Sequence, residues 1–183
     1  VLSVDIQHPN QLVTKEIIQS SGAEKFVNSD TSNDILKIVV KDRYNDATPS
    51  CGFIKGFKLK NGAFASSIAH DSHNLIAVGT NDKDITNSIN EIIRLKGGLA
   101  VSSSDSLTSL RLNIAGIMTT CSCEEVAKEY KKLNELIKSM GCEMTAPFMT
   151  LSFMALLVIP ELKISDRGLF DVTKFEMVSL FVE

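Results

Sequence analysis

The chain has 183 residues, of which 44% are hydrophobic and 22% are charged, a composition typical of a globular domain with its own core. Its formal net charge of -3 gives no electrostatic reason to expect binding to nucleic acid or to an anionic membrane. No apolar run reaches the roughly 18–20 residues of a membrane-spanning helix, and the first residues lack a signal-peptide pattern. Because the first residue is Val1 and not Met, we expect a piece of a longer protein or a chain whose beginning has been removed. The lack of a signal-peptide pattern favours a cytoplasmic location.

Extended segments dominate the first half of the chain. Apolar and β-branched patterns predict strands at residues 1–6, 12–18, 35–40, 63–69 and 75–79. Ser20-Ser21-Gly22 breaks the pattern, and residues 28–34 form a polar loop. In the segment 52–62, lysines alternate with apolar residues as on a half-exposed strand, and Asn61-Gly62 predicts a hairpin leading into the strand 63–69.

Two helices are predicted in the second half. The first covers residues 82–96, with Asn81 or Asp82 able to cap its free amides and Gly97-Gly98 to end it. The second begins at Ser122, where Glu125 completes a capping-box pattern, and closes at Gly141. Further strands are predicted at residues 99–101, 107–112 and 175–182, with a turn at 165–168 and a buried apolar run at 146–160. The pattern indicates an α/β single layered domain with a mixed β-sheet packed with helices.

The four cysteines do not have the spacing of a metal or redox motif. Cys121-x-Cys123 is the only close pair, whereas zinc ribbons and thiol redox motifs use CxxC. We expect reduced thiols and no metal site built from these cysteines.

The most distinctive motif is Ala69-His70-Asp71-Ser72-His73-Asn74, a polar loop between two predicted strands. A carboxylate beside an imidazole can orient it, and a second imidazole can carry another proton, so His70, Asp71 and His73 form a candidate general-base cluster. Ser72 is a candidate nucleophile without the Gly-x-Ser-x-Gly elbow. Two other readings stay open: a His-x-x-His metal pair with His8 far away in sequence, and a polar turn whose Asp and Asn bond their own backbone.

The sequence resembles the C-terminal domain of bacterial and archaeal adenine deaminase, a member of the amidohydrolase superfamily. The match begins at about Asp34 and runs in family order through the blocks GFIKGF (52–57), AHDSHN (69–74), VGT (78–80), IAGIM (114–118), PFMTLSF (147–153), VIPELK (158–163), DRGL (166–169) and LFVE (180–183). The chain is thus expected to be one such domain over residues 1–183, with residues 1–34 as a leading segment. It departs from the family at Tyr44, where a histidine is usual, in the link Asn45–Ser50, which is usually glycine-rich, and at Asn113, where a proline is frequent.

The resemblance implies hydrolytic deamination of adenine to hypoxanthine and ammonia. It places manganese or iron in a barrel domain outside this chain, where hydroxide attacks C6 of the purine, and no cofactor is expected in the chain itself. The implied partners are this barrel domain, adenine as substrate and further copies in a homo-oligomer.

Under this interpretation the loop reaches the substrate pocket of the barrel. His70, Asp71, Ser72 and His73 are then catalytic, and Asn74, Ser67 and Arg43 bind substrate. The alternative is a structural or oligomerisation domain in which the loop is only a turn. A free-standing small enzyme with a His-x-x-His metal site is the third reading.

Overall fold

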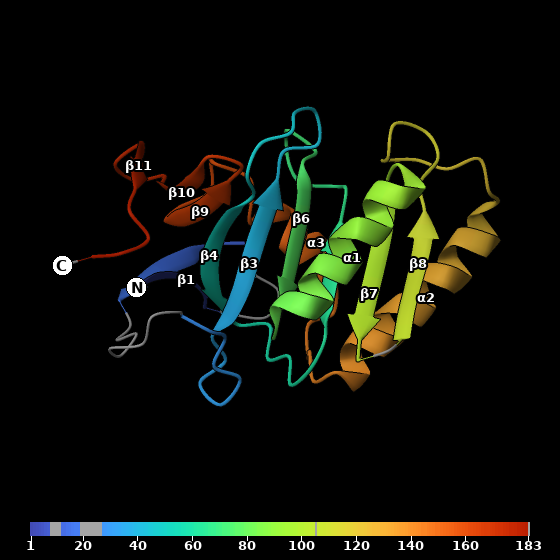
Figure 1. Ribbon diagram of the computed structural model, residues 1–183, viewed down its shortest axis with the longest axis horizontal. Helices are drawn as coiled ribbons and strands as arrows, with labels where there is room; N and C mark the ends of the chain where they lie inside the picture. The colour runs from blue at the N-terminus through green and yellow to red at the C-terminus, as the bar shows by residue number, and fades with distance from the viewer. Residues whose placement is uncertain (8–11, 19–26, 105, 183) are drawn as a thin grey trace.

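The computed structural model describes residues 1–7, 12–18, 27–104 and 106–182 (Figure 1). His8 and the predicted break at residues 20–22 lie outside these ranges. The described chain forms one mixed sheet of eight strands and a smaller sheet of three strands, with three helices packed on the larger sheet. The predicted fold class is therefore confirmed.

The large sheet has the order β2-β1-β4-β3-β6-β5-β7-β8. All neighbouring strands are antiparallel except β1 and β4, which run parallel with Val4 opposite Ile54. Through this pair, the leading hairpin β1–β2 extends the sheet, and β2 is its outermost strand. The strands are β1 (Leu2–Ile6), β2 (Thr14–Ile18), β3 (Leu36–Lys41), β4 (Ser50–Lys55), β5 (Ala63–Ser66), β6 (Leu75–Gly79), β7 (Gly98–Ser103) and β8 (Ser106–Arg111).

Helices cover both faces of the central strands. Helix α1 (Asp82–Leu95) lies on one face, and α2 (Cys123–Ser139) and α3 (Pro147–Phe153) lie on the other (Figure 1). Every residue of β5 and β6 is buried as a result, which is the pattern of strands enclosed on two sides. On the α1 face the strands carry small side chains such as Ala63 and Gly79; a Cβ atom at Gly79 would lie 2.4 Å from that of Ala63.

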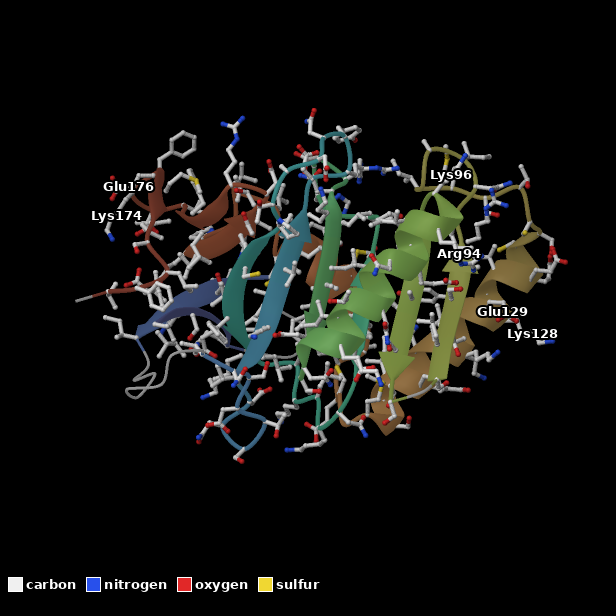
Figure 2. The ribbon with its side chains drawn as sticks, in the orientation of Figure 1. Arg94, Lys96, Lys128, Glu129, Lys174 and Glu176 are labelled. Carbon is white, nitrogen blue, oxygen red and sulfur yellow. The ribbon has the colours of Figure 1, made fainter. Side chains whose placement is uncertain are left out.

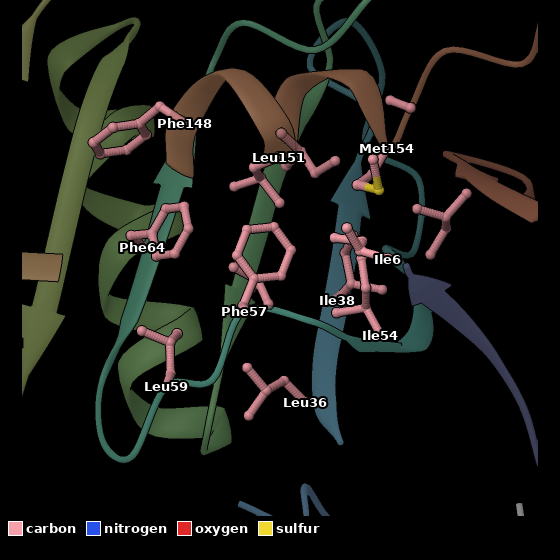
Figure 3. Close-up of a cluster of buried hydrophobic side chains, with 14 of the residues drawn as sticks. Ile6, Leu36, Ile38, Ile54, Phe57, Leu59, Phe64, Phe148, Leu151 and Met154 are labelled. Atoms are coloured by element: carbon pink, nitrogen blue, oxygen red, sulfur yellow. The ribbon is translucent and has the colours of Figure 1, made fainter. Parts of the chain in front are cut away.

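The main core lies between the sheet and α3. Phe148 and Leu151 pack onto Phe64 of β5 and Phe57 of the loop between β4 and β5, whereas Met154 lies over Ile6 and Ile38 (Figure 3). The ring of Phe64 meets the rings of Phe57 and Phe148 edge to face, with centroids 5.7 and 5.2 Å apart. Such aromatic pairs add stabilisation beyond that of the buried area.

The helix ends follow the capping signals in the sequence. The side chain of Asn81 accepts a hydrogen bond from the backbone N–H of Asp84 at the start of α1, and Lys96 ends the helix in a left-handed conformation. Ser122 and Glu125 form the predicted capping box of α2. Helix α3 has no side-chain cap but begins with Pro147, a residue that suits the first helical turn.

The small sheet consists of β9 (Leu162–Ser165), β10 (Gly168–Asp171) and β11 (Glu176–Val178). It packs beside the β1–β2 edge of the large sheet (Figure 1). The backbone N–H of Leu2 donates to the carbonyl of Leu180, with a separation of 2.8 Å, so the two described ends of the chain lie side by side.

Three sequence expectations need correction. The predicted hairpin into β5 through Asn61-Gly62 is wrong, because β4 ends at Lys55 and pairs with β3 and β1, whereas β5 pairs with β6 and β7. The last strand covers only Glu176–Val178 and not the whole of 175–182. The apolar run at 146–160 is expected to be buried and is only partly so: Phe148 and Leu151 of α3 are buried, whereas Met149 is 52% and Val158 70% exposed. No helix among the described residues is long and apolar enough to cross a membrane.

Candidate functional site

The expected site residues lie in loops that meet where the central strands of the large sheet end. Lys41, the last residue of β3, is paired with Leu75, the first residue of β6. The loops 42–49 and 67–74 therefore lie at the same end of the strands. The loop 112–122, which follows β8, lies at this end too (top in Figure 1). Figure 2 shows Arg94 and Lys96 at the end of α1 nearest to these loops.

The histidine loop, residues 67–74, is held at both ends by core strands. Its backbone is tied to α3, because the N–H of His70 donates to the carbonyl of Ser152 across 3.0 Å. The N–H of His73 returns to the carbonyl of Ala69 across 2.6 Å, and His73 itself has a φ of 53°. A left-handed residue that is not glycine marks a tight turn with a defined geometry. The motif is therefore a structured turn, but the Asn74 side chain accepts from the backbone N–H of Arg43 and does not bond the backbone of the turn itself, as the polar-turn reading expected.

The structure brings the two imidazoles of the motif together. The ring centroids of His70 and His73 are 5.9 Å apart, and the ring of His70 also lies 4.6 Å from that of Phe153. Both histidines are half-buried. The Nδ1 atom of His73 is enclosed and has no hydrogen-bond partner among the described residues. Any hydrogen bond between His73 and a ligand is therefore expected at Nε2.

Asp71 and Ser72 point outward from this turn. Both side chains are exposed, and among the hydrogen bonds of the described residues none joins the Asp71 carboxylate to an imidazole. The carbonyl of Ser72 accepts a hydrogen bond of 3.0 Å from the hydroxyl of Tyr44. The four residues predicted to be catalytic, 70–73, therefore lie in one loop. The expected contact by which the Asp71 carboxylate would orient an imidazole is not formed among the described residues.

Two of the expected substrate-binding residues are inside the fold. Ser67 is fully buried; its hydroxyl lies 2.5 Å from the carbonyl of Gly116 and accepts from the N–H of Gly98 at 2.8 Å. Asn74 is 3% exposed, and its side-chain oxygen accepts from the backbone N–H of Arg43 at 3.2 Å. These side chains join segments of the fold, and their binding of substrate stays a prediction.

Arg43 lies at the junction of the loops. Its Nη1 donates to the carbonyl of His73 at 3.1 Å, and its Nη2 donates to the carbonyl of Ala115 at 2.9 Å. The guanidinium carbon is also 5.7 Å from the centre of the Tyr44 ring. Arg43 is thus next to the histidine loop, with donors directed at backbone carbonyls, and its binding of substrate stays a prediction.

The loop that follows β3 is organised by Asp42. Its carboxylate accepts hydrogen bonds from the backbone N–H of Tyr44 at 2.8 Å and from the side-chain amide of Asn45 at 2.9 Å. These bonds, with that of Asn45 the strongest influence, hold the pKa of Asp42 below its usual value. These bonds hold the start of the loop, Tyr44 and Asn45, beside Arg43.

The described residues do not form a metal centre. Among them, no three His, Cys, Asp or Glu side chains come together in a way that could hold a metal ion. The cysteines, expected to be reduced, are all free: Cys51, Cys121 and Cys123 are exposed and Cys142 is buried.

Two hollows lie near α1. The larger, of about 710 Å³, separates α1 from β3 and β4 and is lined by apolar side chains such as Ile89, Ile93 and Phe53. The smaller, of about 470 Å³, is lined by Arg43, Tyr44 and residues at the end of α1. Residues 69–74 line neither of these two hollows.

Sequence reasoning did not identify three contacts of the loop. Phe153 lies against His70, Tyr44 holds the carbonyl of Ser72, and the turn at Ala115-Gly116 meets Arg43 and Ser67. Nothing in local sequence indicates the first two. For the third contact, the glycine in the sequence was a signal of a turn. In the structure Gly116 has a φ of 73°, a conformation that favours glycine.

Residues 11–176 match the family model "Adenine deaminase C-terminal domain". A protein named adenine deaminase from Methanosarcina mazei is 50% identical over all of this chain and 33% of that protein. Its namesake from Methanosarcina acetivorans is 56% identical over 85% of this chain and 28% of that protein. A third, from Parabacteroides distasonis, is 46% identical over 99% and 33%. The chain thus spans about a third of the length of these relatives, and it belongs to the family of adenine deaminase C-terminal domains.

Proposed function

We propose that this chain acts with a metal-bearing barrel domain outside it in the hydrolytic deamination of adenine to hypoxanthine and ammonia. The observation that supports this most is the histidine loop. It presents two adjacent imidazoles from a turn fixed by core strands, in a chain whose relatives, named adenine deaminase, are about three times as long. The proposed manganese or iron belongs to the barrel.

The reaction requires proton transfers that imidazoles can perform. Hydrolysis at C6 adds water and replaces the amino group by oxygen; one proton of that water passes to the departing nitrogen, which leaves as ammonia, and the other ends on the purine ring. His70 and His73 are the proposed proton carriers, because imidazole exchanges protons near neutral pH. His73 would act through Nε2, since its Nδ1 is enclosed. Asp71 and Ser72 are exposed beside them and would face the barrel.

Phe153 would limit the motion of His70. Its ring lies against the imidazole with a tilt of 47°, and the backbone of His70 is bonded to Ser152. A base or acid held in this way needs little reorganisation when substrate arrives, which is an established source of rate enhancement. The loop would also exclude water from the pocket that it closes.

The first test compares adenine deamination by this chain alone with that by the protein that includes its upstream coding region, with manganese added. Activity in the longer protein only is the expected result. Activity in the chain alone would contradict the placement of the metal outside it. Inactivity of both would contradict the proposal and favour a binding role or a protein that has lost the activity.

Variants of the longer protein then test the loop. His73→Asn and His70→Asn keep a polar side chain of similar shape but cannot carry a proton at neutral pH, so turnover should fall on the order of 100-fold or more. Melting temperature and assembly state should stay close to those of the unaltered protein. If His73→Asn leaves turnover intact, or lowers only stability and assembly, the catalytic role of the loop is refuted and the turn is structural.

A further inference from the structure

Arg43 connects the histidine loop to a second loop that is distant in sequence. One guanidinium group donates to the carbonyls of His73 and Ala115, and the backbone N–H of the same residue donates to Asn74. Arg43, which follows β3, thereby holds two loops whose bonded carbonyls, at residues 73 and 115, are 42 residues apart in the sequence. Among the ion pairs of the described residues none includes Arg43, so its donors serve the two loops.

The second loop is shaped to receive the guanidinium. Ala115 and Gly116 have φ values of 53° and 73°, a tight turn that directs the Ala115 carbonyl to Arg43. A Cβ atom at Gly116 would lie 2.7 Å from Nη2 of Arg43, well inside contact distance. On its inner side the same turn is bonded to Ser67 through the carbonyl of Gly116. Arg43 and Ser67 thus hold the turn from two sides.

The planar fork of arginine suits this task. Its donors diverge at fixed angles, so one side chain can reach two carbonyls of different segments, whereas the ammonium of lysine is a compact point charge on a flexible stem. Hydrogen bonds from a charged donor are also stronger than neutral ones. Replacing arginine by lysine would therefore keep the charge and lose the connection.

We propose that Arg43 is a positioning residue that fixes the histidine loop against the 113–118 turn and so sets the direction in which His70 and His73 face the substrate. It acts through the backbone of both loops and does not touch the substrate. This inference rests on the proposed function for its effect on turnover, while the connection between the loops can be measured independently.

The test uses the intact protein with its upstream region and the variants Arg43→Ala, Arg43→Lys and Gly116→Ala. Hydrogen–deuterium exchange should become faster in peptides covering both 67–74 and 113–118. In steady-state kinetics with adenine, kcat should fall on the order of 10- to 100-fold, and KM should change less. Gly116→Ala should reproduce the result because its methyl group displaces the guanidinium without removing it.

Arg111→Ala is the matched control. Arg111 also donates to a backbone carbonyl, that of Leu95 at 3.2 Å, but it holds neither loop. Exchange at 67–74 and kcat should be unchanged in this variant.

The outcomes separate the two proposals. Unchanged exchange in Arg43→Ala would overturn the inference whatever the activity. A higher KM with kcat retained in Arg43→Lys would overturn it in favour of direct substrate binding through the positive charge. Faster exchange with unaltered kcat would overturn both the positioning role and the catalytic role of the loop.

Discussion

Lys163 is expected to reduce the stability of the fold at neutral pH. It is fully buried on β9, and its ammonium donates to the carbonyl of Leu12 and to the hydroxyl of Thr14, each at 2.9 Å. Burial lowers the pKa of Lys163 from 10.5 to about 8. The charged form is therefore less favourable in the folded chain than in the unfolded chain.

The sign and size of the effect follow from this pKa. Between pH 8 and 10.5 the unfolded chain binds a proton that the folded chain has lost, so stability rises with pH in that window. Below pH 8 both states are protonated and the full penalty is present, roughly 3 kcal/mol at 1.36 kcal/mol per pKa unit. Integrated for this single group, the penalty shrinks by roughly 2.5 kcal/mol between pH 7 and pH 10.

Lys163→Met removes the charge and keeps a similar length. It also leaves the carbonyl of Leu12 without this donor, at a cost of about 1–3 kcal/mol, while Thr14 still donates to the carbonyl of Leu162. At pH 7 these effects oppose each other, and the variant should be about as stable as the unaltered chain or slightly more stable. At pH 10 it should be the less stable protein.

Urea denaturation followed by circular dichroism at pH 7, 8, 9 and 10 measures this reversal. The difference between variant and unaltered protein isolates Lys163, since other titrating groups are common to both. Lys174→Met is the control: Lys174 is exposed and its pKa is raised by the hydrogen bond to Asp171, so the stability from that pair is constant well below pH 10. Parallel pH profiles for Lys163→Met and the unaltered chain would refute the reasoning.

Three further substitutions test the core, a cap and the histidine loop. Phe148→Ala should lower the free energy of unfolding by about 3–5 kcal/mol, measured by urea denaturation, because it opens a cavity beside Phe64; a loss below 1 kcal/mol would contradict the packing described. Ser122→Ala removes the capping box and should cost about 1 kcal/mol in the same assay, whereas an unchanged midpoint would show that the cap contributes little. Ser67→Ala leaves the buried carbonyl of Gly116 without its donor and should cost about 1–3 kcal/mol; an unaltered melting temperature would argue against this bond.

Local patterns predicted most of the secondary structure. Residues 75–79 show no alternation between apolar and polar side chains, and they contain no charged or polar residue. This pattern indicates a strand that is buried on both faces, and β6 covers the predicted residues. The capping signals at Asn81 and Ser122 likewise mark the starts of α1 and α2. The order of the strands was not predictable in this way, because pairing of β4 with β1 and β3 depends on contacts between segments far apart in the chain. A good turn signal at Asn61-Gly62 was therefore assigned to the wrong pair of strands.

The site shows the same division between local and distant information. That His70 and His73 lie in one loop between core strands follows from the flanking apolar runs. The hydrogen bonds of Ser67 with Gly98 and Gly116, and of Arg43 with Ala115, join residues that are 31 to 72 positions apart. Local sequence does not predict such bonds. Residue type alone made these polar side chains candidates for binding substrate, and only the fold shows what they bond.

The strand order also has a consequence for folding kinetics. The pairs β3–β4, β5–β6 and β7–β8 are each joined by a short segment, so the entropy of closing these loops is small. The parallel contact of β1 with β4 brings Val4 to Ile54 and closes a much longer loop. Pairings of high sequence separation are expected to form late. Substitutions in the β1–β2 hairpin should thus accelerate unfolding more than they slow folding, and the leading hairpin should be the last part of the sheet to assemble.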